Sequence, residues 1–130
     1  MEGPPPIPAS VDYWGFDAYA VRDPGAEPLY TAFLNAARRG LRPGQRLFQV
    51  LDAQHTPVHA KEGLTAEDMA GVALATYAFA AAQGDVAGML GYTWAGGIDN
   101  LEERGLRDLP DSVIAVHREI GWAILAGGLE

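Results

Sequence analysis

The densest group of potentially reactive side chains lies between residues 52 and 62. These eleven residues include one aspartate, two of the chain's three histidines and one glutamate: Asp52, His55, His59 and Glu62. Imidazole and carboxylate groups are ligands that zinc and similar divalent metals take in catalytic sites, and a metal-bound water can attack esters or phosphoesters. One hypothesis is therefore a zinc site. The alternative is a solvated polar loop, because Pro57 disfavours placing both histidines on one helical face.

Several other kinds of chemistry are excluded by what the sequence lacks. The chain has no cysteine, so disulfides, thiolate metal sites and cysteine nucleophiles are impossible. It has neither a Gly-x-x-x-x-Gly-Lys phosphate loop nor a Gly-x-Ser-x-Gly elbow. The formal net charge of −8 argues against a protein that binds nucleic-acid backbones or anionic membrane surfaces. Without an apolar run long enough to span a bilayer and without a visible signal peptide, we expect a cytoplasmic protein.

A strand–helix pattern that repeats three times must position the reactive side chains. We predict strands over residues 11–21, 46–53 and 86–94, each followed by a loop and a helix. The apolar residues of the predicted helices recur at spacings of three and four: Tyr30, Phe33, Leu34 and Ala37, then Met69, Val72, Ala73, Tyr77 and Ala80, then Val113, Val116, Ile120 and Ile124. Thr65 with Asp68 predicts a capping box before the second helix, and Gly84 predicts its end.

The predicted strands are nearly continuous apolar runs, which is typical of a parallel sheet covered by helices. We therefore expect an α/β fold in which three βα units form one domain over residues 11–125. Residues 1–10 are expected to form a Pro-rich lead-in, and residues 126–130 a tail whose last two residues look like a cloning remnant. Because a three-stranded sheet has two unpaired edges, we expect a homo-oligomer whose copies join through these edges.

The strand spacing and two motifs resemble part of a known barrel. The predicted strands start 35 and 40 residues apart, and eight such units make a (β/α)8 barrel of about 250 residues. Residues 12–19, DYWGFDAY, and 88–94, GMLGYTW, look like the sixth and eighth strands of glycoside-hydrolase-type barrels. Residues 105–110, GLRDLP, are similar to the lead into the last helix of those barrels. The resemblance covers about residues 11–125 and implies a partial TIM barrel of three βα units, completed by oligomerisation.

The resemblance also implies which residues lie at the carboxyl ends of the strands, where barrel enzymes place their chemistry. These residues are Asp17, Tyr19, Asp52, Gln54, Tyr92 and Trp94. Asp52 corresponds to a glutamate nucleophile in the best-known retaining group and is one carbon shorter. The fourth strand, which carries the acid/base in that group, has no counterpart in this sequence. A glycosidase needs two carboxyl groups about 5 to 9.5 Å apart, and Asp17 with Asp52 is the candidate pair at this edge.

The preferred hypothesis is a hydrolase-like protein related to glycoside hydrolases that acts on or binds a small sugar-like or aryl substrate. Asp17 and Asp52 would be its catalytic carboxylates, without a cofactor. The substrate-orienting residues would be Tyr19, Gln54, Tyr92 and Trp94. The first alternative is a metal-assisted ester or phosphoester hydrolase that uses Asp52, His55, His59 and Glu62. The second alternative is a self-assembling barrel fragment without catalysis.

Overall fold

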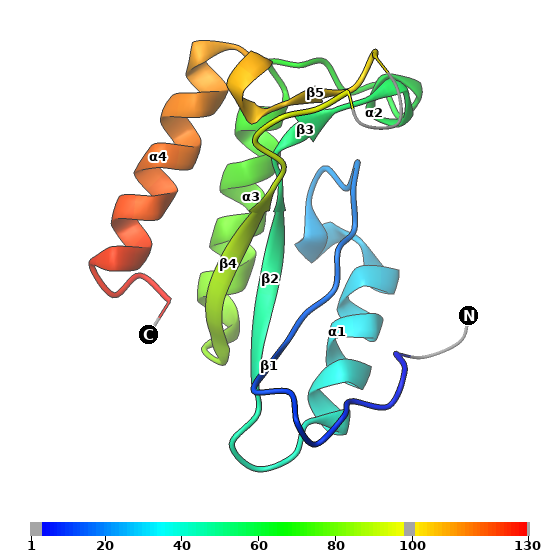
Figure 1. Cartoon of the computed structure of the whole chain (residues 1–130), viewed down its shortest axis with the longest axis vertical. Coiled ribbons are helices and arrows are strands. Elements are labelled where there is room, and N and C mark those ends of the chain that lie inside the picture. The colour runs from blue at the N-terminus through cyan, green and yellow to red at the C-terminus, as the bar shows by residue number, and fades with distance from the viewer. Residues whose placement is uncertain (1–3, 98–100, 130) are drawn as a thin grey trace.

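The computed structural model describes residues 4–97 and 101–129. Its main feature is a parallel sheet in which β2 (Arg46–Asp52) lies between β1 (Tyr13–Trp14) and β4 (Val86–Tyr92), as Figure 1 shows. The other elements are α1 (Pro28–Gly40), α2 (Pro57–Lys61), α3 (Met69–Gln83), α4 (Asp111–Leu125), the 3-10 turns η1 (Pro24–Ala26) and η2 (Leu106–Asp108), and the antiparallel pair β3 (Gln54–His55) and β5 (Arg104–Gly105). The expected mixed α/β fold with a three-stranded parallel sheet is confirmed.

The three long helices pack against one face of the sheet. Leu47 of β2 packs in a cluster with Leu34 and Ala37 of α1. Leu51, four positions after Leu47 on the same strand, packs in a second cluster with Ala73 of α3 and Ile120 of α4. Because alternate residues of a strand point to the same side, both clusters lie on one face, which we call the helix face.

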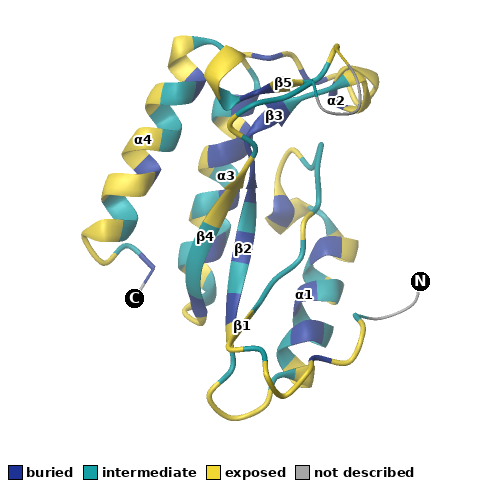
Figure 2. Cartoon of the chain, viewed as in Figure 1, coloured by how far each residue is buried: buried dark blue, intermediate teal, exposed yellow. Residues whose placement is uncertain are grey.

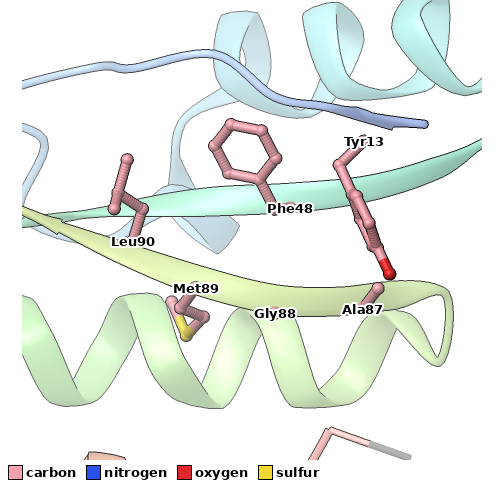
Figure 3. Close-up of a pocket in the computed structure, with 6 residues that line it drawn as sticks. All are labelled: Tyr13, Phe48, Ala87, Gly88, Met89 and Leu90. Carbon is pink, nitrogen blue, oxygen red and sulfur yellow. The ribbon is translucent and has the colours of Figure 1, made fainter. Parts of the chain in front are cut away.

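The opposite face of the sheet carries no helix among the described residues, and we call it the open face. Figure 3 shows Phe48 and Leu90 on the side away from α3, whereas Met89 points toward that helix. Leu90 remains 56% exposed. Figure 2 shows the same contrast between strands: β2 is buried or half-buried toward its carboxyl end, while β4 is exposed there. A parallel sheet that is open on one side is unusual, because such sheets are normally covered on both faces.

The first strand is much shorter than the predicted range of residues 11–21. Only Tyr13 and Trp14 pair with β2, and the chain then diverges from the sheet. Directly after this pairing, Gly15 passes so close to β2 that a Cβ atom there would lie 2.6 Å from the carbonyl oxygen of Phe48. The diverging segment is joined to the sheet again at Ala20, whose backbone N–H donates to Asp52.

The capping box and the glycine end predicted for the second helix are confirmed, while α3 itself begins at Met69, four residues after Thr65. The backbone N–H of Thr65 donates to the Asp68 carboxylate, and the N–H of Asp68 donates to the Thr65 hydroxyl, at 2.7 and 3.2 Å. Gly84 ends α3 in the left-handed conformation with φ of 75°, which glycine adopts at little cost. Local side-chain chemistry is thus sufficient to place this helix.

The predicted lead-in and tail both contain residues that contribute to the core. Ile7 is 5% exposed, and Leu129 is 7% exposed in a cluster with Ala80 and Val86. Residues 1–3 of the lead-in and residue 130 of the tail lie outside the described residues. Among the helices that the structure describes, none is long and apolar enough to cross a bilayer.

Candidate functional site

A hollow of about 430 Å³ lies on the open face, between the diverging segment 15–19 and strands β2 and β4. We call it the edge hollow. Its lining consists of Gly15, Phe16, Asp17, Tyr19, Phe48, Val50, Leu90 and Tyr92. Three residues proposed from the sequence therefore meet here, although Asp17 and Tyr19 come from the first βα unit and Tyr92 comes from the end of β4. The divergence of segment 15–19 from β2 creates the space between them.

Tyr19 links the polar and aromatic parts of the edge hollow. Its ring lies 5.8 Å from the ring of Tyr92, measured between centroids. Its hydroxyl forms a hydrogen bond with the Asp17 carboxylate. Burial raises the pKa of Tyr19 well above its usual value of 10, and the bond to Asp17 and the nearby negative charges raise it further. The hydroxyl therefore keeps its proton at neutral pH and donates it to Asp17.

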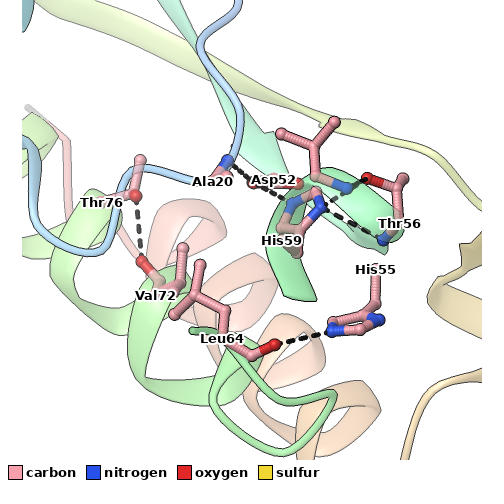
Figure 4. A network of polar contacts seen from close by, with 9 residues as sticks. Ala20, Asp52, His55, Thr56, His59, Leu64, Val72 and Thr76 are labelled. Atoms are coloured by element: carbon pink, nitrogen blue, oxygen red, sulfur yellow. Dashed lines mark hydrogen bonds and ion pairs between the residues drawn. The ribbon is translucent and has the colours of Figure 1, made fainter. Parts of the chain in front are cut away.

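Asp52 ends β2 at the same edge of the sheet but is only 3% exposed. Its Oδ2 atom accepts hydrogen bonds from the Ala20 backbone N–H and from His59 Nε2, both at 2.8 Å (Figure 4). Its Oδ1 atom is buried and has no hydrogen-bond partner among the described residues. One carboxylate oxygen of Asp52 is therefore held firmly, and the other is free to accept a hydrogen bond.

The protonation of His59 follows from its neighbours. The Thr56 backbone N–H donates to His59 Nδ1 at 3.1 Å, so this nitrogen must be unprotonated. The ring proton is then on Nε2 and is donated to Asp52. Thr56 and His59 form a capping box at the start of α2, with Pro57 at the first helical position. We call Ala20, Asp52, Thr56 and His59 the closed corner.

The predicted metal ligands do not converge in this arrangement. His55 Nε2 lies 2.8 Å from the carbonyl oxygen of Leu64, and the His55 and His59 rings are 5.7 Å apart. Glu62 is exposed at the end of α2. Within residues 4–97 and 101–129, no group of three His, Asp or Glu side chains is placed to hold a metal ion. Zinc binding by His59 would require it to release either Asp52 or Thr56.

Gln54 and Trp94 lie near the same edge but outside the lining of the edge hollow. Gln54 is 9% exposed on β3, where it pairs with Gly105 of β5. Trp94 follows β4 and is 61% exposed, and its carbonyl oxygen accepts from the Arg107 backbone N–H at 3.1 Å. The structure thus groups three of the six strand-end residues and keeps these two apart from them.

Three residues of this region, Phe48, Val50 and Ala20, were not expected from the sequence. Phe48 and Val50 line the edge hollow, and their alternation with the buried Leu47, Gln49 and Leu51 is a signal that could have assigned them to a separate face. Ala20 supplies the backbone donor to Asp52 with a positive φ of 57°. No sequence signal marks this position, because alanine rarely adopts that conformation.

The chain was compared with protein-family models, with curated proteins and with solved structures. No family model, curated protein or solved structure matches it. The resemblance to glycoside-hydrolase barrels therefore rests on the sequence motifs, and the geometry of the site is the basis on which a function can be proposed.

Proposed function

We propose that the edge hollow binds a small sugar-like or aryl molecule. The observation that carries this proposal is the meeting of Asp17, Tyr19 and Tyr92 around one hollow at the carboxyl edge of the sheet. Aromatic rings offer an apolar face to a sugar or aryl ring, and a carboxylate accepts hydrogen bonds from hydroxyl groups. The volume of about 430 Å³ is within the range of small-molecule sites. The open side toward solvent gives the ligand a path of entry.

We further propose that the protein corresponds to the last three βα units of a glycoside-hydrolase-type barrel and hydrolyses glycosides. Asp17, exposed at the hollow beside Tyr19, would in its protonated form donate a proton to the glycosidic oxygen as the bond from that oxygen to the sugar carbon breaks. It would then take a proton from the water that adds to this carbon. Asp52, which is buried and does not line the edge hollow, would stabilise the positive charge that develops on the sugar ring through its own negative charge rather than by contact. The His59 and Ala20 bonds to Oδ2 would hold the Asp52 carboxylate in place.

Binding is tested by NMR titration with methyl glycosides and nitrophenyl glycosides. We expect Tyr92→Ala to weaken binding about tenfold, because it removes one ring of the hollow. Tyr13→Ala is the matched control, since Tyr13 is also exposed on the open face but does not line the edge hollow. Equal affinities of the wild type and Tyr92→Ala would contradict the proposal. Release of nitrophenol that is unchanged in both Asp17→Asn and Asp52→Asn would contradict the hydrolytic roles.

We also propose that copies of the chain join through the edges of their sheets. β1 pairs through only two residues, β4 has an unpaired outer edge among the described residues, and the open face exposes Leu90. Light scattering at micromolar concentration is expected to show an oligomer, and a monomer at all concentrations would refute it. Leu90→Lys should dissociate the oligomer, whereas Leu101→Lys should not, because Leu101 is 95% exposed outside the sheet.

The metal-assisted ester or phosphoester hydrolase remains the second candidate. The specific observation in its favour is that the His55 and His59 ring centroids lie 5.7 Å apart and that His59 is bonded to Asp52, whose Oδ1 atom has no partner among the described residues. Zinc would then displace an existing hydrogen bond of His59. Metal analysis and esterase assays with and without a chelator separate the candidates, since hydrolysis that survives chelation excludes a metal-dependent reaction.

A further inference from the structure

A second hollow lies between α1 and the segment that follows β1. We call it the α1 hollow; its volume is about 450 Å³. It is lined by Phe16, Asp17, Ala18, Val21, Glu27, Leu29, Tyr30 and Phe33. Six of these eight residues are apolar or aromatic, and the other two are carboxylates. A mainly apolar lining with a few polar groups is typical of small-molecule sites. Nothing in the proposed sugar site uses the residues that α1 contributes here.

The aromatic part of the α1 hollow is held in place by its own packing. The centroid of the Phe16 ring lies 5.0 Å from that of Tyr30 and 4.7 Å from that of Phe33. The Phe16–Phe33 pair is arranged edge to face. Tyr30 also packs edge-to-face against Phe79 of α3 at 5.7 Å. Burial raises the pKa of Tyr30 to about 12, so its ring is uncharged at neutral pH. The rings of Phe16, Tyr30 and Phe33 therefore hold one another in position along the lining.

The charged part of the α1 hollow is entirely negative. The Oε1 atom of Glu27 accepts from the Leu29 backbone N–H at 3.2 Å, which leaves its second oxygen free. Asp17 shares a hydrogen bond with Tyr19 and is exposed. No Lys, Arg or His side chain lines the hollow. Glu27 offsets the positive end of the α1 dipole, and Asp17 adds a further negative charge.

We propose that the α1 hollow binds a small organic cation with apolar substituents, such as a quaternary ammonium group. Aromatic faces attract such cations through their quadrupole, and the two carboxylates add a direct charge attraction. An anionic ligand would face Asp17 and Glu27 without any compensating cation. The net charge of −8 on the chain also favours a positively charged ligand. The two hollows share Phe16 and Asp17, but α1 supplies three lining residues here, Leu29, Tyr30 and Phe33, and the edge hollow uses none of these three.

The test compares choline with 3,3-dimethyl-1-butanol, a neutral molecule of nearly the same shape, by NMR titration of the full chain. We expect choline to bind about tenfold more tightly, and its affinity to fall as salt is added. Equal affinities for the two molecules would overturn the proposal. Benzoate serves as the anionic probe and is expected not to bind.

Substitutions in the lining of the α1 hollow test whether choline binds there. Glu27→Gln keeps an oxygen that can accept from Leu29 but removes the charge, and Phe33→Leu removes one ring; each should weaken choline binding several-fold. Glu119→Gln, on the exposed side of α4, should leave it unchanged. Tyr92→Ala should also leave it unchanged, which separates this site from the edge hollow. If neither Glu27→Gln nor Phe33→Leu alters choline binding while both retain the wild-type unfolding midpoint, the proposal is wrong.

Discussion

The closed corner and the edge hollow contain the same kind of residue at the same edge of the sheet, with opposite surroundings. Asp52 is 3% exposed and bonded to His59 and Ala20, whereas Asp17 is exposed beside Tyr19. Asp52 ends the central strand, so neighbouring elements cover it. Asp17 lies on a segment that has already left the sheet, so solvent reaches it. Neighbouring elements therefore make the Asp52 carboxylate part of the fold, whereas the Asp17 carboxylate lies at the surface, where a ligand can reach it.

The largest expected difference between the two regions is in stability. Asp52→Ala would leave the Ala20 N–H and the His59 Nε2–H buried without an acceptor, and we expect the free energy of unfolding to fall by about 3 kcal/mol. Asp17→Ala should change it by less than about 0.5 kcal/mol, because the residue is exposed. Urea denaturation measures both. Similar losses in the two variants would show that Asp52 does not stabilise the fold more than Asp17 does.

A smaller effect is expected from the cap that supports the closed corner. Thr56→Ala removes the hydroxyl that accepts from the Val58 N–H and should lower the free energy of unfolding by about 1 kcal/mol. Thr56→Ser keeps this hydroxyl and should restore most of the loss. If thermal unfolding shows no difference between the alanine and serine variants, the cap does not stabilise α2.

The smallest effect concerns proton binding in the edge hollow. Because the pKa of Tyr19 is raised on folding, the folded state holds this proton more tightly than the unfolded state does above pH 10. Stability should therefore be fully present below about pH 10 and should decrease as pH rises beyond it. Ultraviolet titration should show that Asp17→Asn lowers the pKa of Tyr19 only in part, since burial is the largest cause.

Tyr19→Phe removes the step of the ultraviolet titration that belongs to Tyr19 and so identifies it. Tyr13→Phe is the control, because it removes the step of an exposed tyrosine on the open face. An unchanged Tyr19 pKa in Asp17→Asn would mean that the hydrogen bond between the two side chains does not form in solution.

Helices and the sheet type were predictable because their signals are local. The apolar spacing in residues 69–83 and the Thr65–Asp68 pair place α3 within a few residues along the chain, and both are formed by neighbours in the sequence. The short helix α2 was missed, because its capping partner is a histidine rather than the usual Glu or Gln. The full length of β1 was overestimated, because strand pairing depends on a partner that lies more than 30 residues away.

Three of the residues expected at this edge line the edge hollow, Asp17, Tyr19 and Tyr92, but its apolar lining by Phe48 and Val50 was not expected. The expectation that Asp17, Tyr19, Asp52 and Tyr92 lie at strand ends came from the resemblance to barrel enzymes, and β1 ends at Trp14, before Asp17 and Tyr19. Which of them meet follows from long-range contacts: Ala20 approaches Asp52 across 32 residues, and Tyr19 approaches Tyr92 across the sheet. Hydrophobic periodicity, which is a local property of the sequence, was enough to indicate the helices and a parallel sheet. Only the tertiary structure decided that Asp52 is buried and Asp17 exposed, because burial is set by elements that are distant in the chain and packed together by the fold.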